Sequence, residues 1–153
     1  MSNISLKSVK ILEHASEETT CYEAIVYVDN KKAGVVSNDG KGGCSCVRLD
    51  PKFNSLLIQK FEVECFCDHT NPNCFSCKGT GKYEAPLDEY LDQLMEKGKQ
   101  EKIIAKLKKQ GRNVVIITSS SIYGLSTSSK DEAVIRKTFA FQCKEPIMEF
   151  RFL

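Results

Sequence analysis

Four cysteines fall within residues 65–81, whose sequence is CFCDHTNPNCFSCKGTG. The first two are separated by one residue, so on an extended strand both thiols lie on the same side. The last two are separated by two residues, a spacing at which a tight turn directs both sulfurs at one ion. Zn²⁺ prefers such a tetrahedral set of four thiolates. The sequence therefore predicts a Zn²⁺ site formed by Cys65, Cys67, Cys74 and Cys77.

Two other uses of the cluster fit less well. Disulfides require an oxidising compartment, but residues 1–10 contain no apolar signal segment and no apolar run approaches the roughly 20 residues that span a bilayer. We therefore expect a cytoplasmic protein with reduced thiols. A catalytic zinc keeps one coordination position open, and here four cysteines fill the shell. The alternative is a site in which His69 replaces Cys67 and Asp68 acts as a base.

Residues 74–81 resemble half of a zinc repeat found in J-domain co-chaperones, C-x-x-C-x-G-x-G. The resemblance implies a zinc knuckle whose glycines permit the turn. It does not imply co-chaperone activity, because the J-domain and the remaining repeats have no counterpart in this sequence. We expect the knuckle to be an insertion over about residues 61–85.

The rest of the sequence predicts an α+β fold. With 153 residues and 41% apolar content, the chain can bury one core without help from metal, and we expect a single domain over residues 1–153. Alternating apolar residues and turn signals indicate an antiparallel meander. Its strands cover residues 4–11, with a bulge in the middle, and residues 22–28, 33–37 and 44–49; a further strand, residues 61–67, runs into the cysteines.

Helical patterns follow the meander. Asp50, which precedes a proline, predicts a capped helix over residues 51–60. A longer pattern opens at Pro86, is divided at Gly98 and ends before Gly111.

The last part of the chain mixes strands and one more helix. Ser129 and Glu132 have capping-box spacing and predict a helix over residues 133–141. Strand patterns occupy residues 113–118 and 122–128, and residues 144–153 close the chain with the roughly alternating apolar residues Ile147, Phe150 and Phe152. The complete fold prediction is a mainly antiparallel sheet with two or three helices and an inserted zinc knuckle.

Four cysteines lie outside the zinc cluster. Cys44 and Cys46 form a second C-x-C pair, which can bind a second metal, compete for the first, or point into the core as small apolar residues. We favour the core, since no further cysteine pair lies at ligand spacing. Cys21 and Cys143 are expected to be buried free thiols.

Residues 14–43 contain two irregular polar motifs, A-S-E-E-T and S-N-D-G-x-G-G, on either side of an aromatic-containing strand. This segment resembles a family of small uncharacterised proteins of phages and bacteria. The resemblance implies a phage or bacterial origin and supplies no established activity.

The two motifs lie at opposite ends of a strand pair, or side by side if residues 13–20 fold back. One interpretation is turn chemistry, with Ser16 capping a short helical turn. The other is a ligand or partner contact site, in which backbone N–H groups and carboxylates receive the bound group. The residues of that site are Ser16, Glu17, Glu18, Asn38, Asp39 and Gly40.

The net charge of +2 conceals one strongly basic segment. Residues 96–112 contain 7 Lys/Arg against 2 Asp/Glu, whereas residues 1–95 contain 10 against 14. Such a stripe suits phosphate or an acidic partner, or is a solvated helix face. Its basic residues are Lys97, Lys99, Lys102, Lys106, Lys108, Lys109 and Arg112.

These features favour a small non-enzymatic, zinc-stabilised binding protein that acts through a protein partner. One alternative is a nucleic-acid-binding protein that uses the basic helix 96–112, although few aromatic residues near the lysines are available to stack on bases. The other is a metal-dependent enzyme acting on nucleotides, with Glu17, Glu18 and Asp39 around a hard cation.

Overall fold

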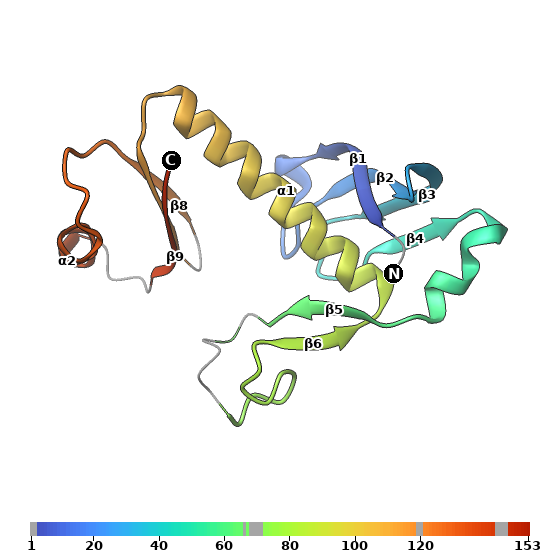
Figure 1. Cartoon of the computed structure of the whole chain (residues 1–153). Helices are drawn as coiled ribbons and strands as arrows, with labels where there is room; N and C mark the ends of the chain where they lie inside the picture. Colours follow the sequence, from blue (N-terminus) through green and yellow to red (C-terminus); the bar gives the residue numbers. More distant parts are fainter. Residues whose placement is uncertain (1–2, 66, 68–71, 119–120, 143–146) are drawn as a thin grey trace. The chain divides into compact units, whose positions relative to one another are not determined.

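The computed structural model describes residues 3–65, 67, 72–118, 121–142 and 147–153, without the side chains of residues 141–142. The chain divides into two compact units, Met1–Lys97 and Gly98–Leu153. Helix α1 (Leu87–Lys109) begins in the first unit and ends in the second (Figure 1). One continuous helix belongs to both units, so this division leaves the expected single domain over residues 1–153 as a prediction.

The first unit contains the expected antiparallel meander. Its four strands are hydrogen-bonded in chain order, and alternate residues of β2 are buried, as a sheet with one face on the core requires. Asp29 and Asn30 form the two-residue turn between β2 and β3 with φ of 47° and 63°, the left-handed values of a type I′ hairpin turn. The strands are β1 (Ile4–Ile11), β2 (Tyr22–Val28), β3 (Lys31–Asn38) and β4 (Cys46–Leu49).

Strand β1 has the bulge that its sequence predicts. Its pairing with β2 shifts between Lys7 and Lys10, and Ser8 within that interval has a φ of 54°. The strand expected over residues 44–49 begins later, at Cys46, because the two preceding residues belong to a loop. Both findings leave the predicted order of the strands unchanged.

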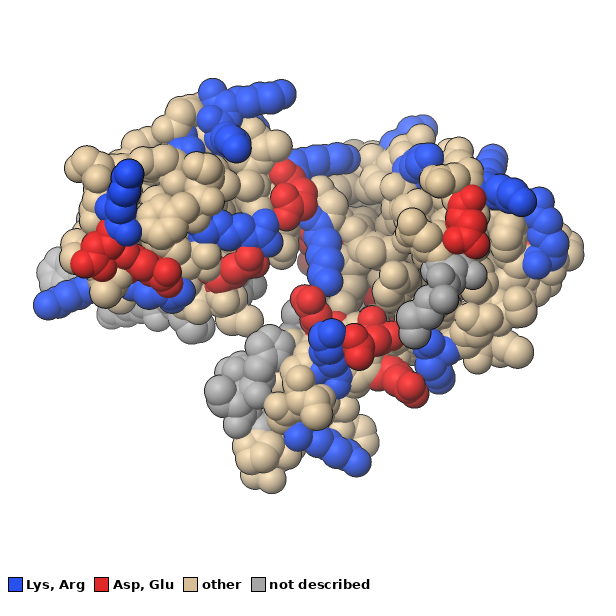
Figure 2. Space-filling view, viewed as in Figure 1, with Lys and Arg blue, Asp and Glu red and all other residues tan. Residues whose placement is uncertain are grey.

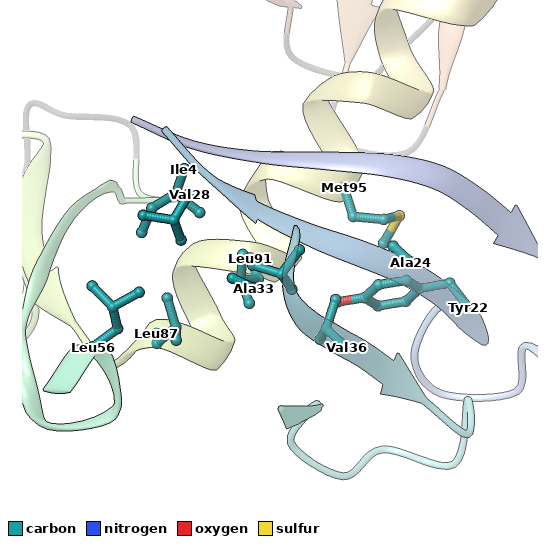
Figure 3. Close-up of a cluster of buried hydrophobic side chains, with 11 residues drawn as sticks. Ile4, Tyr22, Ala24, Val28, Ala33, Val36, Leu56, Leu87, Leu91 and Met95 are labelled. Carbon is teal, nitrogen blue, oxygen red and sulfur yellow. The ribbon is translucent and has the colours of Figure 1, made fainter. Parts of the chain in front are cut away.

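Helix α1 packs its N-terminal half on one face of this sheet. Leu87, Leu91 and Met95 recur every four residues and are 4% exposed or less, so they form one apolar stripe. Figure 3 shows these side chains meeting those of the sheet and Leu56. Burying each large aliphatic side chain stabilises the fold by about 1.5–3 kcal/mol. The sheet residues of this core are Ile4, Tyr22, Ala24, Val26, Val28, Ala33 and Val36.

A buried polar group connects α1 to the sheet. The Asp92 carboxylate accepts hydrogen bonds from the Tyr22 hydroxyl at 2.6 Å and from Ser45 Oγ at 2.5 Å. Burial raises the pKa of Asp92, although both hydrogen bonds favour its charged form, and burial together with Asp92 raises the pKa of Tyr22. These contacts turn Ser45 inward, which leaves its two neighbours in the sequence on the outside.

The helix expected over residues 51–60 is a 3₁₀ helix, η2 (Pro51–Ile58). The capping role predicted for Asp50 is wrong, because its side chain makes no cap hydrogen bond and instead lies 3.8 Å from Lys52 Nζ. After η2, β5 (Phe61–Glu64) pairs with β6 (Lys82–Ala85) as an antiparallel hairpin. The strand expected over residues 61–67 therefore ends before the first cysteine.

The second unit is built around β7 (Val114–Thr118), which lies between β8 (Ile122–Leu125) and β9 (Ile147–Phe152). Ile135 and Phe139 of α2 (Glu132–Gln142) pack against Val114 and Ile116. Ile104 of α1 packs with Val115 and Ile117. Along β7 these two residues alternate with Val114 and Ile116. Every residue of β7 is buried, which explains its continuous apolar sequence.

The predicted capping box of α2 is wrong. The side chain of Asp131, immediately before the helix, accepts hydrogen bonds from the backbone N–H of Ala133 at 2.9 Å and Val134 at 3.4 Å. Glu132 pairs with Arg136 at 2.6 Å, and so does not reach back to Ser129. Asp131, which is closer to the helix, therefore caps α2 in place of Ser129.

The expected α+β class is confirmed. In the described part of the chain the strands form three antiparallel sheets of four, two and three strands, not one sheet. Gly98 does not interrupt α1, whereas Gly111 follows its end with a φ of 76°, as expected. Among the described helices, none combines the length and the apolar character that crossing a bilayer requires.

Candidate metal centre

The β5–β6 hairpin brings together the two ends of the cysteine-containing loop. Glu64 faces Lys82 in the last pair of the ladder, and the Cys65 N–H extends it by donating to the Gly81 carbonyl at 2.8 Å. The loop over residues 65–81 therefore starts and ends at the tip of a hydrogen-bonded hairpin. This closure places the first cysteine pair opposite the second.

The four predicted ligands converge. Their sulfur atoms all lie within 4.8 Å of one another, with Cys65 Sγ 3.6 Å from Cys74 Sγ and Cys67 Sγ 3.2 Å from Cys77 Sγ. The two sulfur atoms of a disulfide lie about 2.05 Å apart, so neither of these distances is that of a disulfide. Four sulfurs at about 2.3 Å from one ion would be about 3.8 Å apart, so the cluster fits a tetrahedral metal site.

The second cysteine pair is shaped by a turn in the left-handed region of backbone conformation. Lys78, Gly79 and Gly81 have φ of 50°, 83° and 76°. Within this turn the Lys78 N–H donates to the Cys74 carbonyl at 2.9 Å. Glycine adopts such a conformation without steric cost, which agrees with the role that the knuckle resemblance implies for the two glycines.

Hydrogen bonds favour the thiolate form of this pair. Burial opposes ionisation of Cys77, but hydrogen bonds from the Cys67 thiol and from the backbone N–H groups of Gly81 and Gly79 lower its pKa to about 6. The backbone N–H of Cys77 is the main cause of the lowered pKa of Cys74. Metal ions bind the thiolate, so both shifts favour coordination near neutral pH.

Gln93 fixes the β5–β6 hairpin to helix α1. Its Nε2 donates to the Glu64 carbonyl at 2.6 Å, and its Oε1 accepts from the Glu64 N–H at 3.0 Å. Phe61 stacks on Tyr90 with ring centroids 5.0 Å apart. Gln93 was not predicted from the sequence, because a polar residue on a helix gives no sign of the distant backbone group that it binds.

The remaining cysteines are placed differently from their predictions. Cys44 and Cys46 are exposed, so their assignment to the core is wrong; the inward contacts of Ser45 point them to solvent. Cys21 is a buried free thiol, as expected. Cys143 lies outside the described residues, and so do His69 and Asp68, on which the open-shell alternative depends.

The two polar motifs lie side by side, as expected if residues 13–20 fold back. The Gly40 carbonyl accepts hydrogen bonds from three successive N–H groups, those of Glu17 at 3.0 Å, Glu18 at 2.9 Å and Thr19 at 3.2 Å. Asn38 is 7% exposed and uses all of its side chain: Oδ1 accepts from Thr19 Oγ1 and the Gly40 N–H, and Nδ2 donates to the Gly43 carbonyl and Ser45 Oγ. Asn38 and Gly40 therefore join two loops.

The other members of this candidate contact site have separate surroundings. Ser16 does not cap a helical turn over the next residues, which was the turn-chemistry prediction; its Oγ accepts from the Cys21 N–H and donates to the Leu12 carbonyl, after η1 (Glu13–Ala15) has ended. Glu17, Glu18 and Asp39 are exposed. Their contact role stays a prediction.

The cysteines are the one group of His, Cys, Asp and Glu side chains, among the described residues, that is placed to share a metal ion. Glu17, Glu18 and Asp39 are not part of such a group. The nucleotide-directed enzyme hypothesis thus gains no support from the described carboxylates.

The predicted basic stripe is divided by the unit boundary. Lys97 belongs to the first unit and lies 3.2 Å from Glu64 Oε1, while the other members belong to the second. Figure 2 shows further Lys and Arg side chains spread over the visible face of the molecule. The stripe in the second unit consists of Lys99, Lys102, Lys106, Lys108, Lys109 and Arg112.

Comparison with known proteins gives no family assignment, since no family model, curated protein or solved structure matches the chain. The resemblance to small phage and bacterial proteins, and the expected origin, stay predictions.

Replacing Cys77 by Ser should abolish metal binding and disorder the knuckle only. Amide exchange over residues 61–85 should accelerate by at least about tenfold, or about 1.4 kcal/mol of local stability, while β2 and β3 stay protected. The physical reason is that the core of the first unit contains none of the four cysteines. Hydrogen exchange resolved by residue measures this. Cys44→Ser, at an exposed cysteine, is the control; loss of protection throughout the Cys77→Ser chain would contradict the expectation.

Replacing Gly40 by Ala should destabilise the first unit by at least about 2 kcal/mol in urea unfolding. Gly40 has a φ of 84°, and a Cβ there would lie 2.2 Å from the Ala15 carbonyl oxygen. Gly43→Ala is the matched control, because no atom lies within 4 Å of its added Cβ, and it should change stability by less than about 0.5 kcal/mol. Equal stability of the two variants would show that contact between the loops is unimportant.

Proposed function

We propose that this protein is a non-enzymatic binding protein in which one Zn²⁺ holds the knuckle, residues 61–85, in shape for docking to a protein partner. The observation that carries the proposal is Phe75, which lies between the two cysteines of the second pair and is 98% exposed. Reduced thiols would suit the cytoplasm of a bacterial or phage-infected cell, which is the location that we propose.

The ligand set supports a structural zinc. Four thiolates fill a tetrahedral shell and leave no position for a substrate or an activated water. Soft sulfur ligands select zinc over magnesium or calcium, which prefer oxygen. When bound, the ion would contribute rigidity: it would tie the turn of the second pair to the hairpin of the first.

Phe75 is suited to act as an anchor. A phenylalanine in water leaves a large apolar area unburied, and aromatic residues dominate the binding energy of many protein interfaces. The turn after it has positive φ at Lys78, Gly79 and Gly81, so the position of Phe75 would depend on this turn and on the metal. With its backbone held in this way, Phe75 loses little conformational entropy when a partner covers it.

The charge of the knuckle favours a protein over a polyanion at this surface. Residues 61–85 contain 2 Lys/Arg against 4 Asp/Glu, and the first unit as a whole contains 11 against 15. A nucleic acid would be repelled by this excess of acid. A protein surface with an apolar pocket and a basic rim fits better.

Replacing Phe75 by Ser should weaken partner binding by about 30-fold or more, corresponding to the roughly 2 kcal/mol of an interface hot spot. The measurement is quantitative capture from lysate of the encoding organism, followed by titration of the captured protein. Metal content should stay unchanged, because Phe75 is not a ligand. Ile58→Ser is the control, since Ile58 is 86% exposed but lies outside the knuckle. Equal partner recovery by Phe75→Ser and the native protein would contradict the proposal.

A further inference from the structure

The C-terminal half of α1 presents a row of lysines in the second unit. Lys99, Lys102, Lys106 and Lys109 follow one another at spacings of three, four and three residues. At about 100° per residue these side chains lie within an arc of about 80° on the helix. They form one face, here called the lysine face, and Lys108 lies on the opposite side of the helix.

The core of the second unit fixes the direction of this face. Ile104 is 6% exposed and packs with Val115 and Ile117, and Leu107 packs against the same cluster. Both residues lie on the side of α1 away from the lysine face. The helix cannot turn the lysines inward without exposing these apolar side chains.

The acidic residues that the structure describes leave the charge of the lysine face uncompensated. Glu101, the one acidic residue of this half of α1, lies 2.6 Å from Arg151 Nη1. Among the described residues, no carboxylate lies within ion-pair distance of the four lysines. The second unit contains 11 Lys/Arg against 5 Asp/Glu, a balance opposite to that of the first unit.

We propose that the lysine face binds the phosphodiester backbone of nucleic acid, independently of the metal knuckle. Its four ammonium groups are distributed over about 15 Å of helix axis, and duplex DNA carries one phosphate per about 1.7 Å. Each lysine can therefore meet a phosphate. Lys97 is not part of the site, because it pairs with Glu64 in the first unit.

The composition of the face favours a nucleic acid over an acidic protein. Lysine is depleted at the centres of protein interfaces, where aromatic residues and arginine are enriched. The lysine face contains neither an aromatic residue nor an arginine. Without aromatic side chains it cannot stack on bases, so its binding is electrostatic and independent of sequence.

Salt dependence tests the proposal with the full-length, metal-loaded protein. Anisotropy of labelled duplex DNA, duplex RNA and single-stranded oligonucleotides should give a slope of log K against log salt of about −3.6 for duplex DNA and about −2.8 for single strands. The slopes distinguish the two sources of phosphate. Lys102→Gln/Lys106→Gln should halve the slope and weaken binding by at least about tenfold at 0.1 M salt.

Lys31→Gln/Lys32→Gln is the matched control. These two exposed lysines lie on β3 of the first unit, so the control removes the same charge at a different place. It should change affinity less than about twofold. Equal losses in the two double variants would show a response to net charge only and overturn the site. Absence of nucleic-acid binding at low salt would also overturn the proposal, and an acidic protein would then be the remaining candidate partner of the lysine face.

Discussion

The convergence of four thiols at one point is the constraint on which the knuckle depends. Sulfur atoms within 4.8 Å of one another would repel if all were ionised without a cation between them. The lowered pKa values of Cys74 and Cys77 favour ionisation, and a cation bound between the sulfur atoms would offset the repulsion. We expect such an ion to supply most of the shape of the loop, because the apolar core of the first unit includes none of the four cysteines.

The rest of the first unit is stabilised by other means. Its apolar core joins the four-stranded sheet to α1, and Asn38 and the Gly40 carbonyl join two loops at one end of that sheet. Gln93 is one connection between this part and the knuckle, because its amide holds Glu64 immediately before the first cysteine. The helix thereby supports the start of the loop that carries the cysteines.

Much of the fold could be predicted from the sequence, namely the parts whose structure is determined by residues close together in the chain. The convergence of the four cysteines follows from their spacing, the hairpin turn from Asp29 and Asn30, and β7 from its run of apolar residues. Contacts between distant segments could not be predicted. Ser45 is drawn inward by Asp92, 47 residues away, and this reversed the expected burial of the cysteines on either side of it. The two hydrogen bonds of Gln93 to Glu64 likewise depend on how α1 lies on β5.

X-ray absorption at the zinc edge, on protein purified without added metal, tests whether the four cysteines hold a closed structural zinc. We expect one zinc per chain surrounded by four sulfur atoms at about 2.3 Å, with no nitrogen or oxygen neighbour. A shell that contains nitrogen or oxygen in place of a sulfur would point to an open or mixed site and contradict a closed structural zinc. So would less than about half an equivalent of zinc in protein that is folded and has four titratable thiols in this loop.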